Sequence, residues 1–337
     1  MKYIAPWWLP GGHLQTIWPA LHGRHTASKD APPLGYRRER WPTPDGDFID
    51  VDWRDASINT ASNTPLLVLF HGLEGSSQSH YAQAFAHCAH RCGLAFAVPH
   101  FRGCSGEINL APRAYHSGDF VEIAWILQRL RASTPRPLLV VGVSLGGNAV
   151  LRWAQEAGGH ATQVASAVVS ISAPVDLTAS GNAIGRGVNR LVYTRMFLRS
   201  MKPKAMQKLA QYPGLFNADK LLAARTLYEF DNVFTAPLHG FKNTADYWHK
   251  ASAKPHLAGL RVPSLLVNAQ NDPFIPATSL PQQGTTGSHV TLWQPRHGGH
   301  VGFAQGPWPG HVNALPEAVI GWMAQQSGLI LKAQPHG

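Results

Sequence analysis

The feature that most constrains this chain is a serine between two glycines, directly after a run of β-forming residues. Residues 137–148 read PLLVVGVSLGGN, so Ser144 follows Gly142 and precedes Gly146. The pattern Gly-x-Ser-x-Gly is typical of a sharp turn from a strand into a helix, which exposes the serine as a nucleophile. Glycine is needed on both sides because larger side chains would clash with the tight turn. The sequence therefore predicts a nucleophile elbow at Ser144 rather than an ordinary glycine-rich turn.

Short apolar runs alternate with helical patterns along most of the chain. The expected strands cover residues 48–53, 65–70, 94–99, 137–143, 165–172, 262–268 and 289–293. The expected helices cover residues 79–91, 117–131, a segment that begins at Leu145, and 312–326. Apolar strands that alternate with helices are typical of a parallel sheet covered on both faces. We therefore expect an α/β fold with a mainly parallel central sheet of about eight strands and helices on both faces.

Two segments depart from this alternation. Residues 174–256 interrupt it with mostly helical patterns, and an insertion of that size in an α/β sheet is typical of a cap or lid. We expect a single domain over residues 1–337 with this helical cap inserted in it. Residues 1–33 are rich in Pro, Trp and Gly and are predicted to wrap irregularly over the domain. Apolar side chains of the insertion are expected mainly to pack onto the domain, with a few lining an acyl pocket; examples are Leu191, Val192, Tyr193, Met196, Phe197 and Leu198.

A serine nucleophile needs a general base, and position selects the candidate among 18 histidines. In hydrolases with this elbow, the order along the chain is serine, acid, histidine. The segment after the last expected strand reads QPRHGGHVGF and contains His297 and His300. Either histidine could accept the serine proton; we favour His300 because the glycines before it let the backbone approach Ser144. A metal site at this pair is disfavoured because no carboxylate or cysteine stands at ligand spacing.

The acid that orients the base should follow the strand expected at 262–268. Asp272 is the only acid in the segment there, which reads NDPFIP. Aspartate before proline also initiates turns, so one residue can serve both purposes. Asp176 and Asp231 are alternatives, the first after the preceding strand and the second inside the insertion. We favour Asp272, which would hold the imidazole in one tautomer and stabilise the imidazolium.

Acyl transfer also requires donors for the developing oxyanion. One should be the N–H of Leu145, directly after the nucleophile, and the other should come from the loop after the strand at 65–70. That loop begins HGLEGSS, and Leu73 is the expected second donor because Gly72 lets its N–H turn toward the site. The alternative is an ordinary strand-to-helix loop capped by serine. Glu74 is expected to orient the loop without taking part in catalysis.

Composition and charge exclude several other classes of protein. The net charge is +10, but Lys and Arg are scattered, without a basic run and without interleaved aromatic residues. We therefore expect no nucleic-acid partner and leave open only a weak peripheral attraction to anionic membrane surfaces. The expected chemistry needs no metal and no cofactor, and nothing in the sequence implies an obligate protein partner.

Cysteine usage and the N-terminal segment bear on location. The three cysteines, Cys88, Cys92 and Cys104, form no disulfide framework, and Cys88 and Cys92 are expected as buried thiols on one helix face. Residues 1–15 do not have the pattern of a signal peptide. No stretch approaches the roughly 20 apolar residues of a membrane-spanning helix. A cytoplasmic location is therefore expected.

Taken together, these motifs resemble the YheT-like branch of the α/β-hydrolase superfamily, also called the AB hydrolase 4 family. The resemblance rests on several motifs in order: His13-Leu-Gln-Thr16 near Trp18-Pro19, His71-Gly-Leu-Glu-Gly75, Phe101-Arg-Gly-Cys-Ser-Gly106, Gly142-Val-Ser-Leu-Gly-Gly-Asn148, Gly240-Phe241 with Asp246-Tyr-Trp248, Asn271-Asp-Pro273 and Gly298-Gly-His-Val-Gly-Phe303. It implies the α/β-hydrolase fold, with Ser144, Asp272 and His300 as nucleophile, acid and base. The family often has two acids before the proline, whereas this chain has Asn271 in the first position.

The residues and the resemblance together predict a serine hydrolase of carboxylic esters (EC 3.1.1.-). Members of the family resemble carboxylesterases and lipases that act on short- to medium-chain acyl esters, acylglycerols or phospholipids. One alternative is acyl transfer to an alcohol, which some fungal relatives perform. Another is a non-catalytic ligand-binding protein that kept the fold, although the complete set of expected site residues argues against it. In each case the expected partner is a small molecule.

Overall fold

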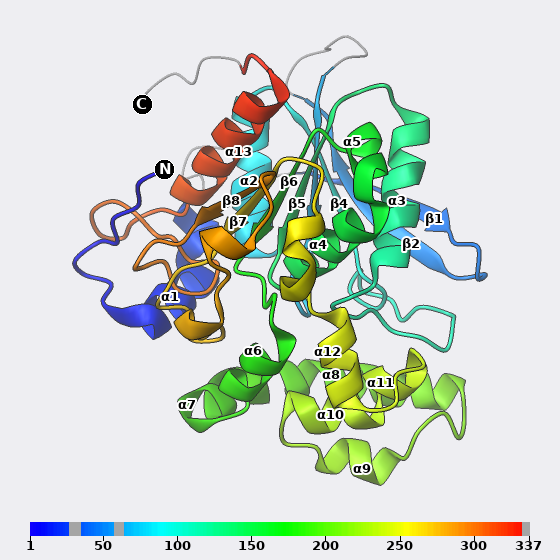
Figure 1. The fold of residues 1–337 in the computed structure, drawn as a ribbon. Helices are drawn as coiled ribbons and strands as arrows, with labels where there is room; N and C mark the ends of the chain where they lie inside the picture. The colour runs from blue at the N-terminus through cyan, green and yellow to red at the C-terminus, as the bar shows by residue number, and fades with distance from the viewer. Residues whose placement is uncertain (27–34, 57–63, 332–337) are drawn as a thin grey trace.

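The centre of the molecule is an eight-stranded sheet in the order β1-β2-β4-β3-β5-β6-β7-β8 (Figure 1). The computed structural model describes residues 1–26, 35–56 and 64–331. The strands are β1 Arg37–Pro42, β2 Phe48–Arg54, β3 Leu66–Phe70, β4 Ala95–Pro99, β5 Leu138–Val143, β6 Ala167–Ile171, β7 Ser264–Val267 and β8 Val290–Trp293. β2 runs antiparallel to β1 and β4, whereas β4, β3 and β5 to β8 are mutually parallel. The predicted α/β-hydrolase fold class is confirmed.

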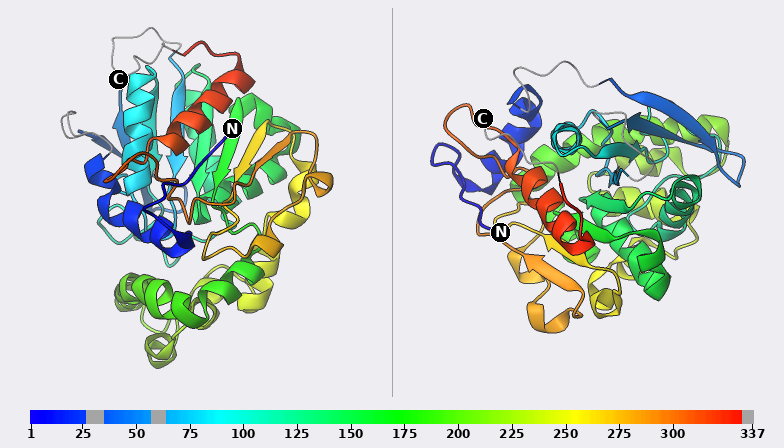
Figure 2. Two further views of the ribbon diagram at one scale, coloured as in Figure 1. Left: turned by 90° about the vertical axis from the view of Figure 1, so that its left-hand side faces the viewer. Right: turned by 90° about the horizontal axis from the view of Figure 1, so that it is seen from above.

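Helices cover both faces of this sheet, because alternate side chains of a strand point to opposite sides. On one face, Val68 and Val140 pack against α3 (Phe120–Ser133) and α4 (Leu145–Ala157). On the other face, Leu67, Leu69, Val141 and Val143 pack against α2 (His80–Arg91) and α13 (Ala314–Ser327), and Figure 2 shows the two helical layers. Burial on both sides explains why the central strands read as unbroken apolar runs. The expected buried thiols of Cys88 and Cys92 lie in the second layer, and neither is part of a disulfide within the described residues.

The chain between β6 and β7 forms a separate group of helices beyond one end of the sheet (Figure 1). Several of them share a small apolar core of their own, which includes Leu198, Leu221, Phe230 and Phe234. The helices are α6 Leu177–Ile184, α7 Gly187–Asn189, η2 Arg190–Thr194, α8 Arg195–Gln211, α9 Ala218–Ala223, α10 Leu227–Val233, α11 Thr235–Leu238, α12 Thr244–Ala251 and η3 Lys254–Gly259. The remaining short helices are η1 Gly158–His160, α5 Ala161–Val164, η4 Ala277–Ser279 and η5 Gln283–Thr285.

The N-terminal segment corrects one prediction. An irregular wrap was expected over residues 1–33, but α1 (Gly11–Thr26) is a helix; residues 27–33 lie outside the described part of the chain. Proline removes one backbone hydrogen bond, so Pro19 inside this stretch argues against a helix on local grounds. Tertiary packing outweighs that penalty, because Leu9 and Trp18 are buried against Ala304 and Val312. Among the described residues, no helix is long and apolar enough to span a bilayer.

Candidate active site

Ser144 occupies the turn between β5 and α4 in a strained backbone conformation. Its φ is 52° and its ψ −119°, a region that non-glycine residues rarely adopt. Its amide N–H donates to the carbonyl of Ile171 on the neighbouring strand at 2.8 Å, which holds the turn in place. A Cβ at Gly142 would lie 2.4 Å from the Gly146 oxygen, and one at Gly146 would lie 2.4 Å from the His71 oxygen. Both glycines are therefore required sterically.

His300 contacts the Ser144 hydroxyl, and Asp272, from another distant loop, contacts His300. The Nε2 atom of His300 lies 3.0 Å from Ser144 Oγ, and its Nδ1 lies 2.8 Å from Asp272 Oδ2. A carboxylate can only accept, so Nδ1–H donates to Asp272 and Nε2 is left to accept the serine proton. Asp272 Oδ1 accepts the N–H of Phe274 at 2.8 Å, and its side chain is fully buried. The Phe274 ring packs on the imidazole with ring centroids 4.2 Å apart.

The alternative candidates lie elsewhere. His297 is exposed, and its nearest polar contact is Asn271 Nδ2 at 3.4 Å. Asp176 caps the start of α6 by accepting the N–H of Ala179. Asp231 lines the cavity described below and accepts hydrogen bonds from Thr235 and Trp248. Burial raises the pKa of Asp231 to about 6. The structure thus brings His300 and Asp272 together with Ser144. His297, Asp176 and Asp231 take no part in this chain of contacts.

Helix α1 holds the loops that carry the histidine and the aspartate. Thr16 Oγ1 accepts the backbone N–H of His300 at 2.9 Å. Gln15 Oε1 accepts from Gly298 N at 2.8 Å and from Asn271 Nδ2 at 2.9 Å. The side-chain oxygen of Asn271 accepts the N–H of Gly299, so its amide both donates and accepts, which a carboxylate cannot do. Reasoning from local sequence missed these positioning roles; the only signal was the His13–Thr16 motif of the family resemblance.

The loop after β3 presents the backbone of residues 72–74 to Ser144. A Cβ at Gly72 would lie 3.2 Å from the Cβ of Ser144, so the loop passes directly beside the nucleophile. Leu73 and Leu145 line the same cavity as Ser144, and in the described part of the chain neither N–H donates to another backbone acceptor. These two amides are therefore free to donate to a bound oxygen atom.

The buried imidazole of His71 fixes the start of this loop. Its Nδ1 lies 2.8 Å from the Gly72 oxygen, and its Nε2 accepts the N–H of Phe101 at 3.0 Å. Burial lowers the pKa of His71 to about 3, so the ring is neutral. A neutral ring with Nδ1–H satisfies both contacts, since Nε2 must be unprotonated to accept.

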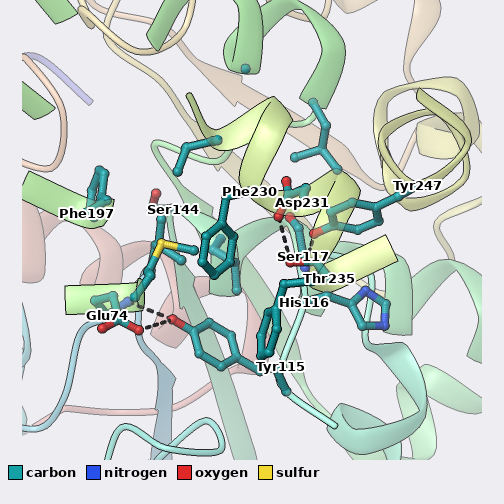
Figure 3. A pocket seen from close by; sticks show the side chains of 18 of the residues that line it. Glu74, Tyr115, His116, Ser117, Ser144, Phe197, Phe230, Asp231, Thr235 and Tyr247 are labelled. Carbon is teal, nitrogen blue, oxygen red and sulfur yellow. Dashed lines mark hydrogen bonds between the residues drawn. The ribbon is translucent and has the colours of Figure 1, made fainter. Parts of the chain in front are cut away.

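A tyrosine and a lysine hold the next turn of the loop, at Glu74 (Figure 3). Tyr115 OH accepts the N–H of Glu74 and donates to its carboxylate, each at 2.9 Å. Lys204, on α8, forms an ion pair with the same carboxylate at 2.8 Å. Glu74 has a φ of 56°, which an unsupported residue of its size would rarely adopt. Because Leu73 precedes this residue, these contacts set the direction of the Leu73 N–H.

Replacing Tyr115 by phenylalanine should therefore lower kcat while leaving KM nearly unchanged. Loss of an oxyanion donor typically lowers kcat by about 10²–10³. Displacing the N–H of Leu73, the expected second donor, should lower it roughly tenfold. The measurement is steady-state hydrolysis of a soluble p-nitrophenyl ester. Tyr212→Phe is the matched control, because its hydroxyl donates to the Leu110 carbonyl and does not touch residues 72–74 of the loop after β3. Equal kinetics in the two variants would refute a role for Tyr115 in positioning Leu73.

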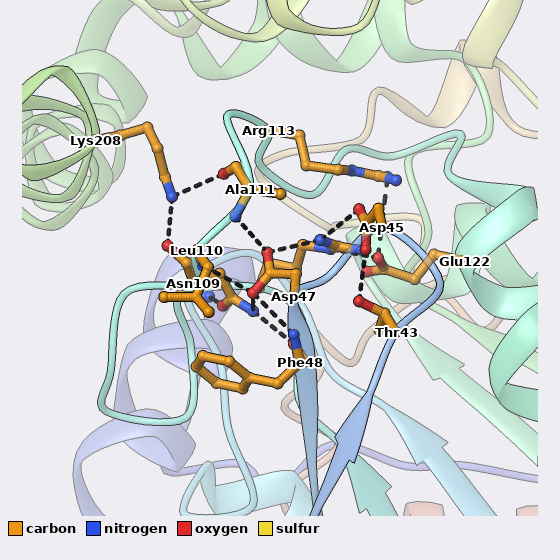
Figure 4. A network of polar contacts seen from close by, with 12 residues as sticks. Thr43, Asp45, Asp47, Phe48, Asn109, Leu110, Ala111, Arg113, Glu122 and Lys208 are labelled. Atoms are coloured by element: carbon orange, nitrogen blue, oxygen red, sulfur yellow. Dashed lines mark hydrogen bonds and ion pairs between the residues drawn. The ribbon is translucent and has the colours of Figure 1, made fainter. Parts of the chain in front are cut away.

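A buried polar network anchors the segment that carries Tyr115 (Figure 4). Arg102 forms ion pairs with Asp47 at 2.7 Å and with Glu122 at 2.6 Å. Burial alone would raise the pKa of Asp47, but backbone N–H groups of Leu110 and Ala111 donate to its carboxylate and the pKa is lowered. The ammonium of Lys208, on α8, donates to the carbonyls of residues 109 and 111. The network thus ties the sheet, the 101–119 loop and α8 together.

The Ser144 hydroxyl opens into a cavity of about 170 Å³ between the sheet and the helices that follow β6 (Figure 3). A cavity of about 150 Å³ accommodates a benzene-sized ligand, so this one has room for an acyl chain. The charged side chains of Glu74, Arg102 and Asp231 are part of the wall. Much of the remaining wall is apolar and includes Ile184, Phe197, Met201, Leu227, Phe230 and Phe234.

Comparison with known proteins gives a consistent picture. Residues 65–307 match the family model described as the α/β hydrolase fold. The chain is 39% identical over 297 residues to the YheT protein of Escherichia coli (strain K12), provisionally named an esterase, and the match covers 87% of this chain and 84% of that one. It is 28% identical to the phospholipase ABHD3 of Mus musculus, over 82% of this chain and 69% of that one. Among solved structures, Est1E from Butyrivibrio proteoclasticus superposes with a TM-score of 0.55 at 14% identity, over 88% of this chain and 100% of that one. At that identity the likeness shows the fold alone.

Proposed function

Because the chain belongs to the α/β-hydrolase fold family, in its YheT-like branch, we propose that it hydrolyses acyl esters through an acyl-enzyme on Ser144. The chain is a carboxylic ester hydrolase, as its similarity to an esterase and a phospholipase supports. The observation that carries the mechanism is the chain of contacts from Ser144 Oγ to His300 at 3.0 Å and from His300 to Asp272 at 2.8 Å. The proposed substrates are short- to medium-chain acyl esters or acylglycerol-type lipids.

The reaction proceeds in two halves. Ser144 Oγ attacks the ester carbonyl while His300 Nε2 takes its proton, and the N–H groups of Leu73 and Leu145 stabilise the oxyanion. Collapse of the tetrahedral intermediate breaks the bond to the alcohol oxygen, and His300 returns the proton to that oxygen. Water then attacks the acyl-enzyme with His300 again as base, which releases the carboxylic acid and regenerates Ser144. Asp272 keeps the imidazole in the tautomer that accepts at Nε2.

Residues 174–256 serve as a cap over this site within a single domain. Ile184, Phe197 and Phe230 of these helices line the cavity that contains Ser144, which supports a role in holding the acyl chain. Removing a chain of methylenes from water is favourable by about 0.8 kcal/mol per group. We therefore expect kcat/KM to rise with acyl length until the cavity is filled and then to fall.

A panel of p-nitrophenyl esters from acetate to palmitate tests this proposal. The expected profile has a maximum at intermediate chain length, because the cavity is apolar and of limited volume. The same reactions with added ethanol distinguish hydrolysis from transfer, since an acyl-enzyme that prefers the alcohol yields the ethyl ester. If the protein cleaves none of these esters and does not react with a fluorophosphonate, the esterase proposal is wrong and the non-catalytic alternative is left.

A further inference from the structure

One long helical run in the cap has an exposed apolar face. The run is formed by α7, η2 and α8 and spans residues 187–211. Leu191, Val192 and Met196 were expected to pack onto the domain, but they are 65%, 43% and 55% exposed, and Val188 is 59% exposed. The opposite side is buried, for example at Tyr193 and Leu198. The packing prediction is wrong for these residues, since the helical period turns them to solvent.

The charge of this segment is unbalanced. Residues 177–218 contain seven basic residues and no Asp or Glu; the seven are Arg186, Arg190, Arg195, Arg199, Lys202, Lys204 and Lys208. The four arginines are exposed and alternate with the exposed apolar side chains. Within the described residues, none of the four forms an ion pair with a carboxylate. Arg195 and Arg199 thus add positive charge to the exposed side of this helical run.

We propose that this face, defined by Val188, Leu191, Val192, Arg195, Met196 and Arg199, docks the enzyme on lipid bilayers that contain anionic phospholipids. A helix with apolar residues and arginines on its outer side lies in the plane of a bilayer interface, with the apolar side chains inserted near the headgroups. The arginine stems follow the apolar side chains while the guanidinium groups remain at the phosphates. The absence of any acid in residues 177–218 removes the repulsion that would oppose anionic lipid.

The same helical run also borders the cavity of the proposed esterase. Phe197 and Met201, on α8, line the cavity into which Ser144 points. They are close in sequence to the exposed residues Met196 and Arg199 of the same helix. The His13 ring stacks on Tyr193 with Nδ1 3.1 Å from the hydroxyl, so α1 braces the buried side of the run. Docking through the outer side would bring the cavity to the surface where acyl lipids reside. This link to catalysis rests on the proposed function, whereas the docking itself does not.

A second copy of the chain is a less favourable occupant of this face. A two-fold interface would pair the face with itself and oppose its arginines to one another, which costs like-charge repulsion without a compensating acid. An anionic bilayer supplies the opposite charge and an apolar layer together. Charge complementarity therefore selects the lipid surface.

Vesicle sedimentation with the Ser144→Ala chain tests docking without hydrolysis. We expect binding to phosphatidylcholine vesicles that contain about 30% phosphatidylglycerol, little binding to phosphatidylcholine alone, and loss of binding at about 0.5 M NaCl. Arg195→Gln/Arg199→Gln should weaken binding by about 25-fold, since each charge near an anionic surface contributes a factor of about five. Leu191→Ser/Met196→Ser should weaken it by a similar factor through lost insertion.

The matched control is Arg136→Gln/Arg261→Gln. Arg136 lies just before β5 and Arg261 just before β7, at the amino ends of these parallel strands, and neither lines the cavity. This variant has the same charge loss and should bind as the parent does. The proposal would be overturned if both arginine variants lost vesicle binding equally, or if the protein bound neutral and anionic vesicles equally. It would also be overturned if the protein self-associated instead of binding vesicles. The same substitutions in the chain with Ser144 intact should leave hydrolysis of soluble p-nitrophenyl butyrate unchanged, which separates failed docking from failed catalysis or folding.

Discussion

Ser144→Ala should lower kcat for p-nitrophenyl butyrate by about 10⁵–10⁶, to a rate supplied by the oxyanion donors and binding alone. This corresponds to about 7–8 kcal/mol of lost transition-state stabilisation. The physical reason is that Ser144 Oγ is the atom that His300 Nε2 approaches, at 3.0 Å, and alanine leaves the base without a nucleophile to activate. The measurement is the initial rate with purified protein, combined with covalent labelling by a fluorophosphonate probe, which should disappear.

Ser133→Ala provides the matched control for this substitution. Its hydroxyl donates to the Leu130 carbonyl at the end of α3, far from the cavity lining. Rate and labelling should stay at the parental level. A Ser144→Ala chain that keeps more than about a hundredth of the parental rate would show that another group forms the acyl-enzyme or that no acyl-enzyme forms.

The second large effect separates two histidines three positions apart in one loop. His300→Ala should reduce kcat by about 10⁵–10⁶, because removal of the base costs about as much as removal of the nucleophile when the two act as a unit. His297→Ala should stay within about threefold of the parent, because an exposed side chain away from the site contributes little. Both substitutions remove an imidazole from the same segment, so their comparison isolates the contact with Ser144 and Asp272.

The outcome that contradicts this assignment is a large loss in His297→Ala with a small loss in His300→Ala. Rate measurements should be accompanied by thermal unfolding of each variant, because His300 also contacts Phe274 and its backbone is held by Thr16. Double substitution of Ser144 and His300 should cost no more than either change alone, which is the signature of residues that act together.

Much of the fold was predictable because its signals are local. The continuous apolar runs of the central strands report burial on both faces, and the elbow at Ser144 needs glycines only two positions away. The relative order of Ser144, Asp272 and His300 was also accessible, since each follows an expected strand and the carboxyl ends of parallel strands meet at one edge of a sheet. These features depend on spacing along the chain.

Helix α1 was not predictable in this way. Its local sequence contains Pro19 and several glycines, which argue against a helix, and its stability comes from packing against residues near the other end of the chain. The contact between Thr16 and His300 joins groups 284 positions apart, and no periodicity connects them. Only the folded chain shows that Gln15 and Thr16 hold the loops of His300 and Asp272.

The sequence by itself determined the nucleophile turn and the alternation of strands and helices, and it reduced the candidates for acid and base to a few residues, because spacing and side-chain chemistry carry that information. Tertiary structure decided which histidine reaches Ser144, how Tyr115 and Lys204 support Glu74, and which apolar residues of the helices between β6 and β7 face solvent. The physical reason is that burial and orientation depend on what packs against a residue. Leu191 and Leu198 belong to the same apolar stretch, yet one is 65% exposed and the other 6%.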